Sequence, residues 1–381
     1  MRLITSTKEY QIPGLARPGF PILLWNDMNS CREANEFLRQ YLMQGSIASQ
    51  RSWEPIGRAL YDYFGYLESN DLNWRDVGRG EHKNLPAAYR DYCGEVFGHR
   101  RNTIRLRLTY VFQFYEYALN KSWIERLPYT YQERRSFNSK GFLSHLDVSG
   151  GKVSVPSPMP RKRTSTIKFL SIADSRRLVG EAKNVHHKTI IKFFLRSGLR
   201  RAELATFPLP YVFDPDERGI RTKNVSILLD PQDGTGMKTK GSKERTIWIP
   251  REMMKELSRY AKYHRGERAS LSECEQSQLF LSQKGVAFAD DGKSIEVIIR
   301  EIGQRIGIKI HPHMLRHTYA THTLNLLQRA KRQGNLEPLV FLQNQLGHAS
   351  IEQTRKYLHL VKHLADDAVL DYDRELNREG S

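Results

Sequence analysis

The spacing of apolar residues divides the chain into two parts. Over residues 25–125, apolar side chains recur every three to four positions, which predicts a group of amphipathic helices. After residue 168 the helical spacing continues, but alternating patterns interrupt it at 224–230 and 245–250. Two such segments joined by a Gly-rich turn predict a β-hairpin. The chain is therefore predicted to be mainly α-helical with a small antiparallel β element.

The same pattern predicts the domain organisation. Residues 1–24 are short mixed segments with several prolines and are predicted to be an extended lead-in. Residues 25–140 form a predicted helical domain, and residues 168–381 a mixed α/β domain that ends in a C-terminal tail. Residues 141–167 are dense in Gly, Ser and Pro, show no hydrophobic period and end in a basic run, so we expect a linker. Helices in the second domain are expected at about 172–183, 186–197, 251–264, 293–306, 313–330, 336–345 and 350–363.

Charge then suggests the kind of partner. The 381 residues carry 60 Lys and Arg against 42 Asp and Glu, a net charge of +18. Such a surplus favours a polyanionic partner, most commonly nucleic acid, over an unspecialised basic protein. The candidate DNA contacts are Arg100, Arg101, Arg105 and Arg107 at the start of the longest helix, Arg161, Lys162 and Arg163 in the linker, and Lys238, Lys243 and Arg245 near the hairpin turn. Each cluster could instead be a solvated surface.

Other classes of protein fit less well. The three cysteines are far apart and form no C-x-x-C pair, which argues against a disulfide framework and a thiolate metal site. No stretch approaches the ~18 apolar residues of a membrane span. The protein is expected in the cytoplasm, associated with the nucleoid, and without membrane contact.

Four short motifs could carry chemistry. HPHMLRH places His313 and Arg316 on one helix face, where an imidazole beside a guanidinium suits a phosphate. His313 and His317 have the spacing of a zinc helix, but the glutamate and a third ligand are missing, so we expect no metal. SGLRRAEL pairs Arg200 with Glu203, either as a surface ion pair or as an arginine oriented by a carboxylate. Lys240 lies in the Gly-rich turn, as a solvated lysine or one delivered into a groove.

The fourth motif is QLGHASIEQTRKYLHL, which contains His348 and Tyr357. The buried stripe of its predicted helix is formed by Ile351, Thr354, Leu358 and Val361. At about 100° per residue, Tyr357 lies roughly 80° from the centre of this stripe. We therefore expect Tyr357 at the rim of the packed face, where it could pack or reach a neighbouring surface.

Together these motifs define a chemical set. Arg200, Lys240, His313, Arg316, His348 and Tyr357 supply two guanidiniums, an ammonium, two imidazoles and a phenol. No carboxylate cluster for Mg²⁺ accompanies them. Cations that stabilise a pentacoordinate phosphorus, with a phenol as nucleophile, can cleave a phosphodiester without a metal or other cofactor.

At this point residues 168–360 resemble the tyrosine recombinase, or phage integrase, family. SGLRRAEL is similar to its first arginine motif, HPHMLRH to its H-x-x-R motif and LGH to its second histidine motif, with the tyrosine nine positions after His348. The helical domain is similar to the family's DNA core-binding domain in helix number and charge. Only about 24 residues precede the first predicted helix, too few for the added arm-binding domain of some relatives.

The resemblance implies a two-domain clamp on DNA and the role of each residue. Tyr357 would attack the scissile phosphate to give a 3′-phosphotyrosine, with Glu203 supporting Arg200 and Lys240 donating a proton to the leaving group. Arg200, Arg316 and His348 would hold the non-bridging oxygens, and His313 would help to move a proton, as base toward the tyrosine. The partners would be double-stranded DNA with inverted-repeat core sites and three further copies of the chain in a tetramer, with a Holliday-junction intermediate and with accessory proteins possible. The tail from about residue 361 is either a dock on a neighbouring copy or a frayed acidic end.

Two other functions remain open from the sequence. A type IB topoisomerase or telomere resolvase would use the same nucleophile. A non-catalytic DNA-binding regulator could keep the fold and lose the chemistry. His313 in the H-x-x-R motif favours a recombinase, and the complete set of six residues argues against a regulator.

Overall fold

The computed structural model divides the chain into two compact units, Met1–Ser165 and Thr166–Ser381. It describes all residues except 13, 45–46, 48, 81–82, 136–151, 164–166, 331–336, 359 and 361–381. The C-terminal tail predicted to dock on a neighbour lies almost wholly outside the described residues. Within the described ranges, no helix is both long and apolar enough to cross a membrane.

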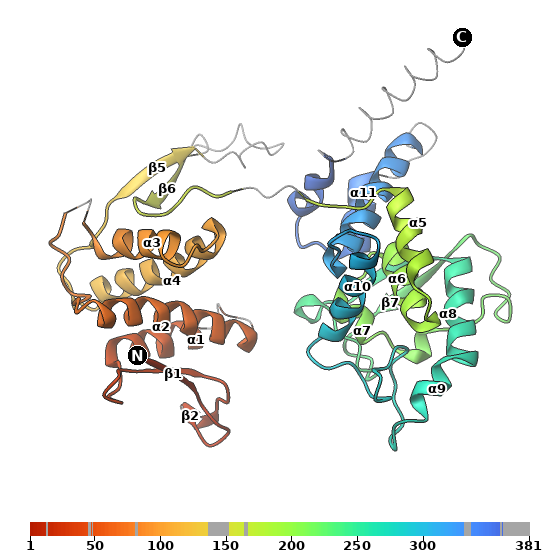
Figure 1. Ribbon diagram of the computed structural model, residues 1–381, viewed down its shortest axis with the longest axis horizontal. Helices are drawn as coiled ribbons and strands as arrows, with labels where there is room; N and C mark the ends of the chain where they lie inside the picture. Colours follow the sequence, from red (N-terminus) through yellow and green to blue (C-terminus); the bar gives the residue numbers. More distant parts are fainter. Residues whose placement is uncertain are drawn as a thin grey trace, which may run out of the picture. The chain divides into compact units, whose positions relative to one another are not determined.

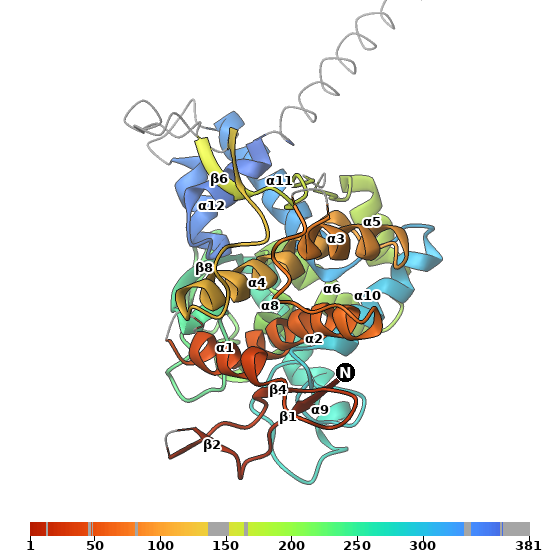
Figure 2. The ribbon, with the colours of Figure 1, turned by 90° about the vertical axis from the view of Figure 1, so that its left-hand side faces the viewer.

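The first unit is a helical bundle with small β-ribbons. Its helices are α1 (Arg32–Met43), α2 (Trp53–Ser69), α3 (Leu85–Glu95) and α4 (Arg101–Asn120), with a 3₁₀ turn at Gln50–Ser52. Helices α2 and α4 lie side by side (Figure 1; Figure 2), and both contribute to a core rich in aromatic side chains. The N-cap of α3 is Asn84, whose buried Oδ1 accepts a hydrogen bond from the amide of Ala87 at 2.8 Å.

The predicted lead-in is folded into this unit. Strands β1 (Arg2–Thr5) and β4 (Pro21–Leu24) pair antiparallel, as do the two-residue strands β2 (Gln11–Ile12) and β3 (Leu15–Ala16). Phe20 and Leu23 are buried in the helical core. The boundary predicted at residue 24 is therefore wrong, because segments too short to show a period still contribute apolar anchors to the bundle.

The predicted linker also begins too early. Strand β6 (Lys152–Pro156) pairs antiparallel with β5 (Tyr131–Arg135), and Met159 is buried in the core of the first unit. Single apolar residues among Gly, Ser and Pro gave no periodic signal, yet they attach this segment to the bundle. Part of the segment, residues 141–151 and 164–166, lies outside the described ranges.

In the part of the second unit that the structure describes, helices pack around a single hairpin. Its helices are α5 (Ile172–Glu181), α6 (Val185–Ser197), α7 (Arg201–Ala205), α8 (Arg251–Tyr263), α9 (Arg265–Ala269), α10 (Lys293–Arg305), α11 (Pro312–Ala330) and α12 (Pro338–Leu346), followed by helical residues at 351–358. Short 3₁₀ turns lie at Leu209–Tyr211 and Lys240–Ser242. The predicted fold class, mainly α with a small antiparallel β element, is confirmed.

The hairpin has the alternation predicted for it. Strand β7 (Asn224–Leu229) pairs antiparallel with β8 (Arg245–Pro250), so that Ile227 lies opposite Ile247. Alternate residues of β7 are buried in the unit's main core, which satisfies the two-residue period of a strand with one packed face. Helices α6 and α11 pack against each other, and α12 packs on both α11 and β8. These contacts bring the ends of α6, β8, α11 and α12 together.

Candidate functional site

The first arginine of the site lies at a sharp turn between two helices. Helix α6 ends at Gly198, which has a left-handed backbone (φ 66°, ψ 21°), and a Cβ there would lie 2.4 Å from the ring of Tyr319. The turn makes Arg200 the N-cap of α7. Its side chain donates hydrogen bonds to Glu203 Oε1 at 2.8 Å and to the carbonyl of Gly347 at 2.7 Å.

A buried carboxylate orients two arginines. The side chain of Glu203 is 1% exposed and accepts two hydrogen bonds from Arg245, at 2.8 and 2.7 Å, besides one from the side chain and one from the backbone amide of Arg200. Burial by itself would raise the pKa of Glu203, but the bonds and charge of Arg245, with the charges of Arg200 and Arg316, lower it to about 2. Glu203 is therefore ionised at neutral pH, and its negative charge offsets part of the surrounding positive charge.

The second arginine of the site is fully enclosed. Arg316 on α11 is 2% exposed and donates to the carbonyl of Gly198 at 2.6 Å and to the carbonyl of Leu346. Burial, followed by the charge of Arg200, lowers the pKa of Arg316 to about 9. The guanidinium thus stays protonated at neutral pH, held between the end of α6 and the end of α12.

The second histidine of the site, His348, lies just after the end of α12. Helix α12 ends at Gly347, whose φ of 61° is left-handed and whose position would bring a Cβ within 2.8 Å of Arg245. His348 follows this turn, and its Nδ1 is hydrogen-bonded to Thr354 Oγ1 at 2.9 Å. Residues 346–348 therefore supply two carbonyls to the arginines and the imidazole that lies beside them.

A buried glutamine connects these segments and had no signal in the sequence. Gln345 is 1% exposed. Its side-chain amide donates to the carbonyls of Ser197 at 3.1 Å and Trp248 at 3.0 Å and accepts from the Trp248 amide at 2.8 Å. It thereby ties β8 to the ends of α6 and α12, which fixes the turns on which Arg200 and His348 lie.

Tyr357 is buried, which contradicts the predicted rim position. It is 2% exposed and packs with Ala320, Leu324 and Leu346 in a small cluster separate from the main core. Ile351, expected in the buried stripe, is instead 39% exposed. The stripe was centred wrongly because this helix packs on α11 and α12 through its later residues. Val361 lies outside the described residues.

The phenol of Tyr357 contacts two histidines. Its Oη is hydrogen-bonded to Nδ1 of His317 at 2.8 Å, and its ring stacks on His348 with centroids 6.2 Å apart and an interplanar angle of 4°. His313 lies against His317, with ring centroids 4.2 Å apart. From the sequence we considered His317 only as a possible metal ligand. Its contact with Tyr357 was not predictable, because the two residues are 40 positions apart.

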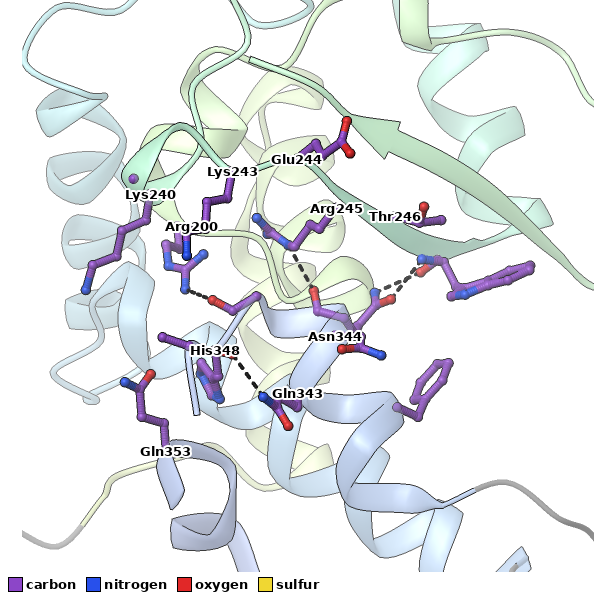
Figure 3. A pocket seen from close by; sticks show the side chains of 16 residues that line it. Arg200, Lys240, Lys243, Glu244, Arg245, Thr246, Gln343, Asn344, His348 and Gln353 are labelled. Atoms are coloured by element: carbon purple, nitrogen blue, oxygen red, sulfur yellow. Dashed lines mark hydrogen bonds between the residues drawn. The ribbon is translucent and has the colours of Figure 1, made fainter. Parts of the chain in front are cut away.

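Lys240 and Arg200 line a surface cavity of about 790 Å³. Lys240 is exposed at a 3₁₀ turn, and in Figure 3 its side chain and that of Arg200 extend toward the side of the cavity where His348 lies. Lys243 and Gln343 also line the cavity, whereas Tyr357 is not among its lining residues. The cavity is thus open to a phosphate between cationic and imidazole groups, with the tyrosine stacked on His348.

The candidate DNA contacts separate into two groups. Arg100, Arg101, Arg161, Lys162, Arg163, Lys238 and Lys243 are exposed. The other three have protein partners: Arg245 is held by Glu203, Arg107 forms an ion pair with Asp62, and Arg105 donates to the carbonyl of Pro160. The DNA contact of Arg245 stays a prediction, because its side chain turns from the hairpin toward the buried carboxylate but also lines the cavity. Arg105 and Arg107 likewise face protein groups.

This cluster of arginine, histidine and tyrosine side chains is a set that can act on a phosphodiester. The model of the phage integrase family matches residues 168–363, more than half of the chain. The chain therefore belongs to the phage integrase family, the tyrosine recombinases. It is a site-specific DNA recombinase of the class that includes integrases and transposases of mobile elements.

Relatives and solved structures agree with this family. Transposase A from transposon Tn554 of Staphylococcus aureus (strain Mu50 / ATCC 700699) is 27% identical over 282 residues, covering 73% of this chain and 70% of the relative. Tyrosine recombinase XerC from Shewanella sp. (strain ANA-3) is 32% identical over 182 residues, covering 47% and 50%. The Tn1549 transposon integrase in complex with transposon right end DNA matches with a TM-score of 0.55 and 17% identity, over 85% of this chain and 94% of that one. The last similarity concerns the fold alone.

Proposed function

We propose that Tyr357 cleaves one DNA strand by attacking the scissile phosphate. The phenol oxygen forms a bond to phosphorus, the bond to the 5′ oxygen breaks, and the protein stays joined to the 3′ phosphate. A single observation carries the proposal, the meeting of these side chains at residues 346–348. Arg200 and Arg316 donate hydrogen bonds to the carbonyls of Gly347 and Leu346, and Tyr357 stacks on the adjacent His348. Rejoining is the same step in reverse, with a 5′ hydroxyl as the nucleophile.

The remaining groups take the roles that charge and position allow. Arg200 and His348, which line the cavity, hold the non-bridging oxygens, where negative charge grows in the transition state, and the enclosed Arg316 adds its positive charge. Lys240, exposed at the mouth of the cavity, donates a proton to the leaving 5′ oxygen. His313 helps to move the proton released by the tyrosine, through its ring contact with His317. Glu203 keeps Arg200 in place.

The substrate and assembly follow from the need to join two duplexes. We propose double-stranded DNA with inverted-repeat core sites, bound by four copies of the chain, with a Holliday junction as intermediate and action at the nucleoid. One structural neighbour, the XerH recombinase bound to palindromic difH substrate, has a TM-score of 0.55 at 16% identity. A palindromic site consists of inverted repeats, which supports inverted repeats as the form of site proposed for this chain.

Trapping on a suicide substrate tests the function. A nick close to the cleavage point releases a short fragment, so that rejoining fails and the covalent adduct accumulates. We expect an adduct at one position in DNA that carries the repeats. Binding without any adduct would identify a regulator, and relaxation of supercoiled plasmid that lacks the repeats would identify a topoisomerase.

Replacing Arg200 with alanine is expected to slow adduct formation by at least ~10²-fold, as loss of one preorganised donor to a developing oxyanion does. Rapid-quench measurement on the same suicide substrate gives the rate. Arg201→Ala is the matched control, because that neighbouring arginine pairs with Glu296 and does not line the cavity. Equal rates in the Arg200→Ala and unmodified proteins would remove Arg200 from the site.

DNA binding is expected to weaken steeply with salt, with a log–log slope of about −0.9 for each phosphate contacted. Arg100 and Arg101 are exposed at the start of α4, so changing both to glutamine should make the slope shallower by about 1.8 if each contacts one phosphate. Arg107→Gln, on the same helix but paired with Asp62, should leave the slope unchanged. Fluorescence anisotropy across a salt series measures all three. An unaltered slope in the double variant would exclude this surface from the contact.

A further inference from the structure

One histidine outside the predicted set contacts the nucleophile directly. His317 follows Arg316 on α11 and is half-buried. Its Nδ1 lies 2.8 Å from Tyr357 Oη, and the two rings are 5.7 Å apart at 55°. A nitrogen at hydrogen-bonding distance from the hydroxyl permits proton transfer between the two groups.

We propose that His317 is a catalytic residue, the group that accepts the proton of Tyr357 as the phenol attacks. The inference rests on the proposed function, in which Tyr357 is the nucleophile. The phenol Oη–H donates to an unprotonated Nδ1, so the neutral imidazole carries its own proton on Nε2. In the step, the Oη–H bond breaks, a bond from Oη to phosphorus forms, and the proton passes to Nδ1, leaving His317 as an imidazolium.

The other two histidines are placed less well for this transfer. His348 stacks parallel to the phenol ring, so it presents its face, and its Nδ1 is engaged by Thr354. His313 contacts the ring of His317. Among the hydrogen bonds of the described residues, His317 is the histidine joined to the Tyr357 hydroxyl. His313 is then one step further along, where it can pass the proton to solvent.

The groups facing His317 keep it neutral before DNA binds. Burial lowers the pKa of His317 to about 3, with further contributions from His313, Arg316, His311 and Lys356. Burial raises the pKa of Tyr357 to about 12, against the opposing charges of Arg316 and Arg200. The phenol is therefore un-ionised at neutral pH and needs a base. A bound phosphate offsets the charges of Arg316 and Lys356, which raises the pKa of His317 and makes it a stronger base when substrate is present.

The pH dependence of cleavage separates a base from a structural residue. With His317 present, the base is unprotonated in the upper part of the range from pH 6 to 9, so the rate of adduct formation should level off there. In His317→Ala the attack depends on the small ionised fraction of the phenol. We expect a rate at pH 7 lower by about 10²- to 10⁴-fold, which then rises about tenfold per pH unit. A uniformly lower rate with an unchanged profile would mean that His317 is only structural, and would overturn the proposal.

Two further variants complete the test. His317→Asn keeps an oxygen acceptor near the position of Nδ1 but cannot take the proton, so it should fold and bind DNA normally and still show the steep profile. A flat profile with a restored rate would overturn the proposal. His313→Ala should lower the rate without introducing the tenfold slope, whereas a slope in that variant alone would assign the base to His313.

A measurement on the protein without DNA keeps this inference distinct from the proposed function. In ¹⁵N spectra, the two ring-nitrogen resonances of His317 are those that disappear in His317→Asn, and their couplings to the carbon-bound ring protons distinguish Nδ1 from Nε2. The Nδ1 resonance should have the shift of an unprotonated nitrogen and should move in Tyr357→Phe. A protonated Nδ1 between pH 6 and 8 would overturn the inference whether or not the protein cleaves DNA. If wild-type protein gives no adduct while this signature is found, the proposed function fails and the histidine–phenol contact stands.

Discussion

Tyr357→Phe is expected to abolish the covalent protein–DNA adduct completely while leaving DNA affinity within about twofold. The phenol oxygen is the atom that would bond to phosphorus, and a phenyl ring keeps the packing with Ala320, Leu324 and Leu346. Because Tyr357 is buried and does not line the cavity, its hydroxyl contributes little to binding DNA before cleavage. Suicide-substrate trapping and an anisotropy titration measure the two quantities.

The chain offers a matched control for the lost hydrogen bond. Tyr260 is also buried, and its hydroxyl is hydrogen-bonded to Nδ1 of His186 at 2.5 Å, away from the cavity. Tyr260→Phe and Tyr357→Phe should each cost about 0.5–1.5 kcal/mol of unfolding free energy, but the former should retain adduct formation. An adduct that persists in Tyr357→Phe would sink the assignment of the nucleophile.

Glu203→Ala should give the largest loss of stability, about 3–5 kcal/mol in the free energy of unfolding, because it leaves Arg245 buried without its carboxylate and Arg316 with one fewer counter-charge. Urea denaturation measures the loss. Glu296→Ala removes the carboxylate partner of Arg201 at a more exposed position and should cost less than about 1 kcal/mol. Similar losses in the two variants would mean that the buried charge network contributes little.

Glu203 should also make the free energy of unfolding depend on pH below about 4.5. The pKa of Glu203 is about 2 in the folded protein against an ordinary value of 4.5, so the group stabilises the fold fully above pH 4.5. The stabilisation, roughly 3 kcal/mol, is lost as the pH falls from 4.5 toward 2. Glu203→Gln removes this titration, and its unfolding free energy should vary less with pH in that window than the wild-type value. An identical pH dependence would assign the acid sensitivity to other carboxylates.

Much of the fold was predictable because its signals are local. The alternation in β7 and β8 and the helical spacing of α6, α8, α10 and α11 appear within each segment. The boundaries that failed depend on single apolar anchors. Leu23 and Met159 attach their segments to the first unit, but neither belongs to a periodic run. A lone buried residue leaves no pattern in the sequence until its packing partner is known.

The functional site was likewise predictable only in part. Motif order and spacing were enough to select Arg200, Arg316, His348 and Tyr357, which the structure brings together. The environment of each residue was not predictable. Arg245 resembled its exposed neighbours Lys243 and Lys238, yet only the fold shows that it turns toward Glu203. Gln345 on α12 and His317 on α11 contact residues on other elements, Ser197 and Tyr357. Spacing along the chain does not predict such contacts.

The carbonyls at the end of α12 restrict the side-chain rotamers of Arg200 and Arg316. An unrestrained arginine gives up about 2 kcal/mol of rotamer entropy when it is immobilised. Arg200 and Arg316 are already fixed, each by a hydrogen bond to a neighbouring peptide of residues 346–347 and by a second protein acceptor. Most of that ordering is complete when the protein folds. A phosphate entering the cavity therefore meets Arg200 already in position, and more of its binding energy remains for the transition state.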